Sequence, residues 1–260
     1  MVIRLSSPRV RTSEFWESSF RRSLDNPPEI PWDSAVNLSE AERNTIRSSI
    51  QEFQLGEQSE GRHLKQAARD YAQLSGDAAY SRAMELFIRE EQRHAALLGS
   101  LMDLVGIARI RHTCVDSVFR RLRRFAGLET SICVLLTAEV IAKIYYRALL
   151  AATASPALRA ICRRLLEDEA SHVEFQSERL AILRRKRARW RVAAAVAIQR
   201  LLFAGSVAVV ICRHKPVRRL ANYSFLAFWR DCHREFRQSL ILMDPAHYTF
   251  SHTNVGRARM

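Results

Sequence analysis

The sequence predicts an all-α protein: a four-helix bundle with a long crossover between its second and third helices, followed by additional C-terminal helices. Three observations predict this fold class. Through residues 39–182, apolar residues recur every three or four positions, which is the period of an amphipathic helix. No segment stands out with the alternating apolar and polar residues of a half-buried strand. The 260 residues include only 8 Gly and 7 Pro, which argues against a loop-rich β fold.

Residues 1–38 are expected to form an extended N-terminal arm, because Ser, Arg and Pro are frequent there. The stretch 26–31 contains three prolines and cannot be a continuous helix, since each ring removes a hydrogen-bond donor and restricts the residue before it. We expect Phe15, Trp16 and Phe20 to dock the arm onto the body of the protein.

The first helical hairpin of the bundle begins at Ser39-Glu40-Ala41-Glu42, which is a capping box. One helix is expected to continue from there to Tyr71, because apolar residues and glutamates recur along a single seam. Ser75-Gly76-Asp77 ends this helix, and Asp77 can cap the next one. The apolar face of that second helix extends from Tyr80 to Leu101.

The second hairpin follows a longer connection, residues 107–130, in which 115–125 are expected to form a short basic helix. A third helix is expected over 131–151. Ser155-Pro156 marks the start of the fourth, because proline is well tolerated at the first helical position. Two hairpins joined by a crossover pack most economically as a four-helix bundle.

The C-terminal region, residues 183–260, is expected to be a helical extension that ends in a loose tail. A basic run at 184–191 precedes an apolar segment, 192–212, which is long enough to cross a membrane. Arg200 lies near the middle of that segment and would cost about 2.5–3.5 kcal/mol there. We therefore favour a fifth helix that covers the bundle and lines an apolar channel, with another helix over 220–242.

Six side chains predict a centre for two metal ions. Two bundle helices carry a Glu-x-x-His motif. Each of the other two helices places a Glu on its inward seam, 31 or 30 residues before the Glu of the motif that follows it. The six residues are Glu60, Glu91, His94, Glu139, Glu169 and His172. Positions i and i+3 of a helix project from one face, so each motif can bind one ion. One motif alone is a weak signal, because Glu60-Gly61-Arg62-His63 is a third copy; the repeated order and spacing are specific.

Physical chemistry supports metal binding at these side chains. Buried carboxylates are costly unless they are paired or bound to a metal. Carboxylate and imidazole ligands suit iron or manganese better than an ion that prefers thiolate. The expected cofactor is therefore two metal ions, iron in the first place and manganese as the alternative. Two other interpretations stay open: a coincidence of solvated helix faces, or a bundle that keeps the pattern without binding metal.

Residues 40–180 resemble the ferritin-like superfamily of di-iron carboxylate proteins. The stretches Glu90-Glu91-Gln92-Arg93-His94 and Asp168-Glu169-Ala170-Ser171-His172 are similar to the motifs of bacterial multicomponent monooxygenases and ribonucleotide reductase small subunits. The resemblance implies that Asp168 and Glu90 orient the histidines. It also implies that Glu91 and Glu169 bridge the two ions.

The ligand from the first bundle helix is either Glu57 or Glu60. The stretch from Gly56 to Arg62 resembles the first ligand helix of rubrerythrins, which implies Glu57, whereas the internal symmetry favours Glu60. The Cys pairs of a rubredoxin-like tail are missing, so a true rubrerythrin is not expected. Tyr146 lies two turns from Glu139 and is either a radical or hydrogen-bonding residue near the metals or a core residue.

The predicted function is that of an oxidoreductase, a non-haem di-iron or Fe/Mn carboxylate enzyme. It would activate O2 or peroxide to oxidise a small apolar organic substrate, with electrons from an external donor. The apolar helix downstream of the bundle favours this function over iron storage. One alternative is a ferroxidase, an iron-handling protein or a peroxide scavenger. A second alternative is a non-catalytic helical scaffold at a membrane or nucleic acid.

Charge and cysteine content bear on partners and location. The net charge is +14, from 41 Lys and Arg against 27 Asp and Glu. This excess favours peripheral contact with an anionic membrane, and a nucleic acid partner is less expected; a homodimer is a further expectation. Five scattered Cys without a CxxC pair indicate a reduced, cytoplasmic setting. The first residues contain no apolar run typical of a secretory signal.

Overall fold

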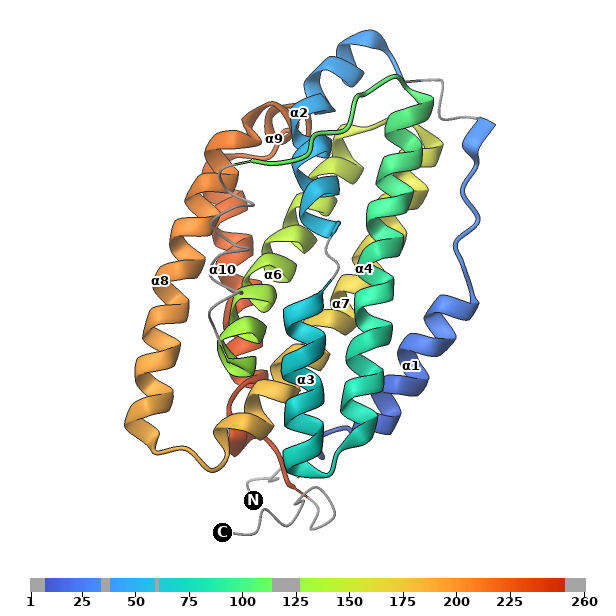
Figure 1. The fold of residues 1–260 in the computed structure, drawn as a ribbon. Helices are drawn as coiled ribbons and strands as arrows, with labels where there is room; N and C mark the ends of the chain where they lie inside the picture. The colour runs from blue at the N-terminus through green and yellow to red at the C-terminus, as the bar shows by residue number, and fades with distance from the viewer. Residues whose placement is uncertain (1–7, 34–37, 59–60, 114–126, 251–260) are drawn as a thin grey trace, which may run out of the picture.

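The computed structural model describes residues 8–33, 38–58, 61–113 and 127–250 (Figure 1). In these residues the β structure is one isolated bridge between Arg9 and Thr249, and all other regular structure is helical. The all-α prediction is confirmed. The expected short helix at 115–125 lies outside the described residues.

The N-terminal segment differs from the expected extended arm. Helix α1, Ser13–Asp25, is capped by Thr12, whose side chain accepts a hydrogen bond from the backbone N–H of Phe15. It packs on α4. The expectation was wrong here because the prolines follow this helix, while Trp16 and Phe20 share one face of it. Both side chains are buried as expected, whereas Phe15 is 48% exposed.

The first bundle helix is interrupted. Helix α2, Glu40–Glu57, begins at the predicted cap Ser39, but it ends at Glu57, and α3, Arg62–Ser75, starts after a break. Gly61, which precedes α3, has a φ of +60°, a left-handed conformation that favours glycine. A Cβ atom there would lie 2.6 Å from Cδ1 of Ile88. The expectation of one continuous helix to Tyr71 was therefore wrong, although both pieces keep the seam.

The other three bundle helices begin and end close to the predicted positions. Helix α4, Ala78–Leu104, is capped by Asp77, and α7, Pro156–Arg184, is capped by Ser155 with Pro156 in its first turn. Helix α6, Leu128–Ala152, packs along α7. Together with α2 and α3 they form the predicted four-helix bundle (Figure 1).

Three further helices cover one side of the bundle: α8, Arg189–Arg213; α9, Lys215–Leu220; and α10, Phe225–Leu242. Helix α8 packs against α6 and α10, which confirms a fifth covering helix. Within the described residues it is also the helix that is long and apolar enough to cross a membrane, and 22% of that apolar stretch is buried.

The C-terminal tail is ordered further than expected. A 3-10 turn, Pro245–His247, follows α10. Tyr248 is buried, and the backbone N–H of Thr249 donates to the carbonyl of Pro8 at 3.0 Å. The loose-tail expectation was therefore wrong for residues 245–250, and residues 251–260 lie outside the described part.

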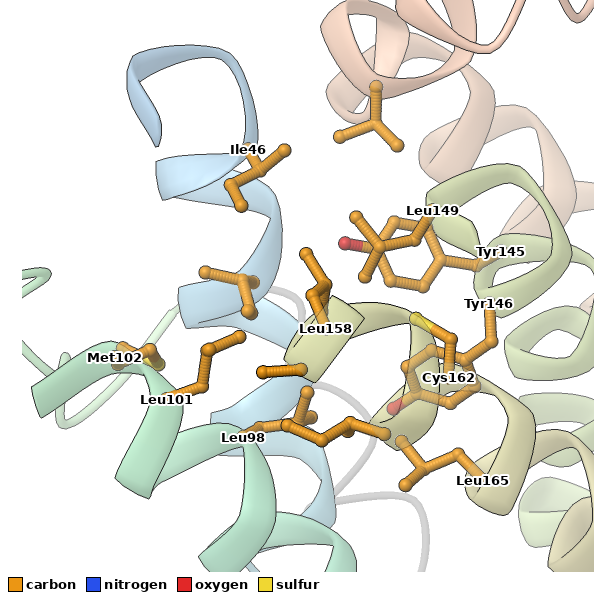
Figure 2. Packing of buried hydrophobic residues seen from close by; sticks show 14 of the residues in the cluster. Ile46, Leu98, Leu101, Met102, Tyr145, Tyr146, Leu149, Leu158, Cys162 and Leu165 are labelled. Carbon is orange, nitrogen blue, oxygen red and sulfur yellow. The ribbon is translucent and has the colours of Figure 1, made fainter. Parts of the chain in front are cut away.

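Two apolar clusters fill the bundle at different levels. One is built from α2, α4, α6 and α7 and includes Leu98, Tyr145 and Leu165 (Figure 2). The other includes Phe87 on α4 and Phe175 on α7, with α1 contributing Trp16 and Phe20. The polar side chains described next lie along α4 and α7 between these two clusters.

Candidate metal centre

Four helices bring the glutamates and histidines of the predicted centre together. Helix α4 carries Glu91 and His94 one turn apart, between Phe87 and Leu98. Helix α7 carries its Glu and His in the same way, α6 supplies one Glu, and α2 supplies a Glu from its last turn. The four further residues are Glu57, Glu139, Glu169 and His172. All but Glu91 are buried, and the side chain of Glu91 is only 13% exposed.

The six side chains form two groups of four, and each group could hold one metal ion. Glu57 and His94 complete one group, and Glu139 and His172 complete the other. Glu91 and Glu169 belong to both groups. In each group the ligand atoms all lie within 4.8 Å of one another.

Each histidine is oriented by an acidic residue on the neighbouring helix. Nε2 of His94 lies 3.0 Å from Oδ2 of Asp168, and Nε2 of His172 lies 2.9 Å from Oε2 of Glu90. A carboxylate at Nε2 favours a proton on that nitrogen, so Nδ1 is the atom that each ring would offer to a metal ion. Both Nδ1 atoms face the glutamates of the centre.

Asp168 is itself held by a network that sequence reasoning missed. Nη2 of Arg93 lies 2.9 Å from its Oδ2, and Nε of Arg164 lies 3.0 Å from the same atom. Both guanidinium groups also donate to the backbone carbonyl of Ser23 on α1, at 2.7 and 3.1 Å. The sequence could have predicted the contact of Arg164, because this residue lies four positions before Asp168 on the same helix face. Nothing in the sequence indicated the contact with Ser23.

Two more hydrogen bonds hold Glu57 and Glu139, each of which belongs to only one of the two groups. The hydroxyl of Tyr146 donates to Oε1 of Glu57 at 2.5 Å. The amide Nε2 of Gln176 donates to Oε1 of Glu139 at 3.1 Å. Tyr146 is therefore both a buried residue and a hydrogen-bond partner of the centre. Gln176 was missed, although its position one turn after a histidine on α7 placed it on the right face.

Several buried polar atoms of the centre have no hydrogen-bond partner. They are both carboxylate oxygens of Glu169, Oε1 of Glu91, and Nδ1 of His94 and of His172; the last of these faces Oε1 of Glu91 at 3.0 Å, an ion-pair contact rather than a hydrogen bond. A buried polar atom left unpaired costs about 1–3 kcal/mol. These atoms belong to the residues of the two ligand groups. Carboxylate oxygen and imidazole nitrogen are ligands that suit iron and manganese. The donor set therefore fits two metal ions, and two divalent cations would balance the charge of four carboxylates.

The protonation of the metal-free centre reflects this crowding. Burial, with the nearby charges of Glu139 and Glu57, raises the pKa of Glu91 to about 8. Burial and Glu139 also raise the pKa of Glu169 well above its ordinary value. Burial opposes ionisation of Glu139 too, but hydrogen bonds and the histidine charges lower its pKa to about 2. Such divergent shifts in one cluster are typical of functional sites.

Glu60 lies outside the described residues, so the structure places only Glu57 of the two candidate ligands from the first helix. His63, in the third copy of the motif, is exposed.

The side chains of Phe87 and Phe20 pack against the ring of His172, and their ring centroids lie 4.7 and 5.9 Å from that of His172. The carbon edges of this ring therefore contact aromatic side chains, while its two nitrogens face carboxylates.

Fold and donor set together define a four-helix bundle built around a carboxylate–histidine cluster that could hold two metal ions. No protein-family model and no curated protein matches the chain. Among solved structures, the fold is similar to three point variants of an R2-like ligand-binding oxidase with a reconstituted Mn/Fe cofactor. Their TM-scores are 0.60, 0.58 and 0.56, each at 14% sequence identity, and each alignment covers 92% of this chain and 94% of the other. At this identity the likeness is one of fold.

Proposed function

We propose that this protein is a di-metal carboxylate oxidase that uses O2 or peroxide to oxidise an apolar organic substrate. The observation that carries the proposal is the pair of donor groups that share Glu91 and Glu169 in a buried site with orphaned ligand atoms. The oxidases of similar fold contain a Mn/Fe cofactor. We therefore propose two iron ions, or one manganese and one iron.

The chain's own residues would divide the work as follows. Glu91 and Glu169 reach both groups and would bridge the ions, while Glu57 with His94, and Glu139 with His172, would each complete one site. When bound, the two ions supply the electrons that reduce O2 or peroxide and the oxidising power that acts on the substrate.

The remaining polar residues position these ligands. Asp168 and Glu90 hold the Nε2 protons of the two histidines, so that each ring presents Nδ1 to its ion. Tyr146 and Gln176 hold one oxygen of Glu57 and one of Glu139. These hydrogen bonds limit how far the carboxylates can rotate.

The proposed class of substrate follows from what borders the centre. Phenylalanine rings lie against His172, and a second apolar cluster that includes Leu98 and Leu165 begins one turn away on α4 and α7. An apolar molecule would lose little hydration energy there, whereas a charged one would need a partner. Electrons would come from a separate donor protein, because the described residues form helices around this single centre. Whether the protein acts as a cytoplasmic homodimer stays a prediction.

Iron binding tests the proposal directly. Anaerobic addition of Fe(II), followed by metal analysis, should give two irons per chain, and exposure to O2 should change the absorption and Mössbauer spectra. Glu139→Ala should retain one iron, and Glu169→Ala should lose high-affinity binding of both. Glu167→Ala, an exposed residue on the same helix, is the matched control and should retain two. Two irons bound in Glu169→Ala would contradict the ligand assignment. Growth of a ferric mineral in a 12- or 24-subunit particle would instead indicate iron storage.

A further inference from the structure

Helix α8 presents an apolar face that no described segment of the chain covers. A set of its exposed apolar residues recurs every three or four positions, so these residues lie on one side of the helix, with exposed Arg200 beside them. We call this the α8 face, and it comprises Trp190, Ala194, Ala197, Ile198, Leu201, Gly205, Ala208, Val209 and Cys212. Trp190, Ile198 and Leu201 are 69%, 68% and 76% exposed. Large apolar side chains gathered in this way mark an interaction surface.

The opposite side of α8 is fixed to the rest of the protein. Phe203, Val207 and Ile211 are buried in a cluster with residues of α6 and α10. Gln199 is buried as well, and its Oε1 accepts a hydrogen bond from Arg184 at 3.4 Å. A crossing of the membrane by α8 would have to break these contacts. The helix is therefore placed to lie along a surface rather than to pass through one.

Positive charge surrounds the α8 face. Residues 179–230 contain 13 Lys and Arg and not one Asp or Glu. Exposed basic residues stand at both ends of the helix: Arg185, Lys186, Arg187, Arg189 and Arg191 at its start, and Arg213, Lys215 and Arg219 at its end. Two of them are paired with acids from other elements, Arg187 with Glu129 and Arg213 with Glu52. The rest leave both ends of the face with an excess of positive charge.

We propose that the α8 face docks the protein on an anionic phospholipid bilayer, with α8 lying flat at the level of the headgroups. The apolar side chains would enter the boundary of the acyl chains, and the basic ends would contact lipid phosphates. Trp190 is suited to that depth, because its ring is apolar and its N–H is polar.

Charge argues against the other occupants. If two copies of the chain paired through this face about a two-fold axis, the basic ends would meet basic ends and repel one another. A nucleic acid would satisfy the basic residues but would leave the apolar residues between them uncovered. An anionic bilayer satisfies both.

Sedimentation with vesicles tests the proposal on the full-length protein. The protein should sediment with vesicles of phosphatidylcholine containing 30% phosphatidylglycerol, but not with phosphatidylcholine alone, and high salt should release it. The metal-free and iron-loaded forms should bind alike, because α8 contributes no residue to the metal centre. The result therefore does not depend on the proposed oxidase activity.

Two variants and their controls make the test specific. Leu201→Glu should weaken binding by about thirty-fold, from loss of one buried leucine. Leu74→Glu is its control, because Leu74 is 80% exposed on α3, away from this face.

A second variant replaces four exposed basic residues by Gln and should weaken binding by about a hundred-fold or more, at about five-fold for each residue. Its substitutions are Lys186→Gln, Arg189→Gln, Lys215→Gln and Arg219→Gln. The control with the same charge change carries Arg22→Gln, Arg89→Gln, Arg111→Gln and Arg163→Gln.

Several outcomes would overturn the proposal. They are failure of the wild type to bind anionic vesicles, and equal loss of binding in Leu201→Glu and Leu74→Glu. Retention in the membrane after washing with salt and alkaline carbonate would indicate a span instead. A dimer in solution that Leu201→Glu dissociates would identify a second copy as the occupant, and tighter binding to duplex DNA than to anionic vesicles would identify nucleic acid.

Discussion

Replacement of Glu169 by Gln should stabilise the metal-free protein at neutral pH. Glu169 is fully buried, and burial together with Glu139 keeps its pKa well above the ordinary value of 4.5. At pH 7 the unfolded chain therefore has this carboxylate ionised, whereas in the folded, metal-free chain the raised pKa favours the protonated form. Folding then requires uptake of a proton, at a free-energy cost that grows by up to about 1.4 kcal/mol for each pH unit above 4.5. Gln has nearly the same shape and needs no proton.

The pH dependence carries the sign of this effect. A carboxyl group whose pKa is raised by folding contributes its full stability below pH 4.5 and loses it as the pH rises toward the folded pKa. The wild type should therefore lose about 1.4 kcal/mol per pH unit relative to Glu169→Gln. The advantage of the variant should therefore be smallest at pH 5 and largest at pH 7, where it reaches at most about 3 kcal/mol.

Urea denaturation with a chelator present, at these three pH values, measures the effect. Glu167→Gln, on the exposed side of the same helix, is the control and should show no pH-dependent difference. A packing defect caused by Gln would shift all three differences equally, so the slope is the test. A difference that stays constant from pH 5 to pH 7, or one that shrinks as the pH rises, would refute the reasoning. With Fe(II) present the order should reverse, because only the wild type gains binding free energy.

Four further substitutions probe other parts of the structure. Asp168→Asn should weaken metal binding by about 10–100-fold, because the ring of His94 loses its carboxylate partner; competition with a chelator measures this, and unchanged affinity would contradict the positioning role. Phe20→Ala should cost about 3–5 kcal/mol in urea denaturation, because the side chain is 1% exposed; a loss under 1 kcal/mol would mean that α1 contributes little. Gly61→Ala should cost about 1–2 kcal/mol or more because of its left-handed backbone, whereas Gly56→Ala, in a helix with open space around it, should stabilise by about 0.5–1 kcal/mol.

The bundle was predictable because its signals are local. Asp77 and Ser155 cap α4 and α7 as predicted, and the periodicity of apolar residues identified the faces that pack. The centre was predictable for the same reason: a Glu and a His three residues apart on a buried face must project together. Repetition of this arrangement in two hairpins gave the expected grouping of side chains.

The errors arose where structure depends on contacts distant in sequence. The seam of α2 continues into α3, so periodicity could not reveal the break before Gly61, which depends on its close approach to Ile88. The N-terminal helix was missed because the neighbouring prolines dominated the local pattern, and because its stability comes from packing of Trp16 and Phe20 on the bundle.

The position of Glu57 sets it apart from the other five donors. Those five lie inside continuous helices, where hydrogen bonds to the turns before and after hold the backbone. Glu57 is the final residue of α2, and the carbonyls of a last turn lack helical partners. Helix ends open locally at a lower free-energy cost than helix interiors. The hydroxyl of Tyr146 therefore restrains the carboxylate whose backbone is the easiest of the six to move. Glu57 could bind a metal ion through one oxygen or through two without a shift of the other helices.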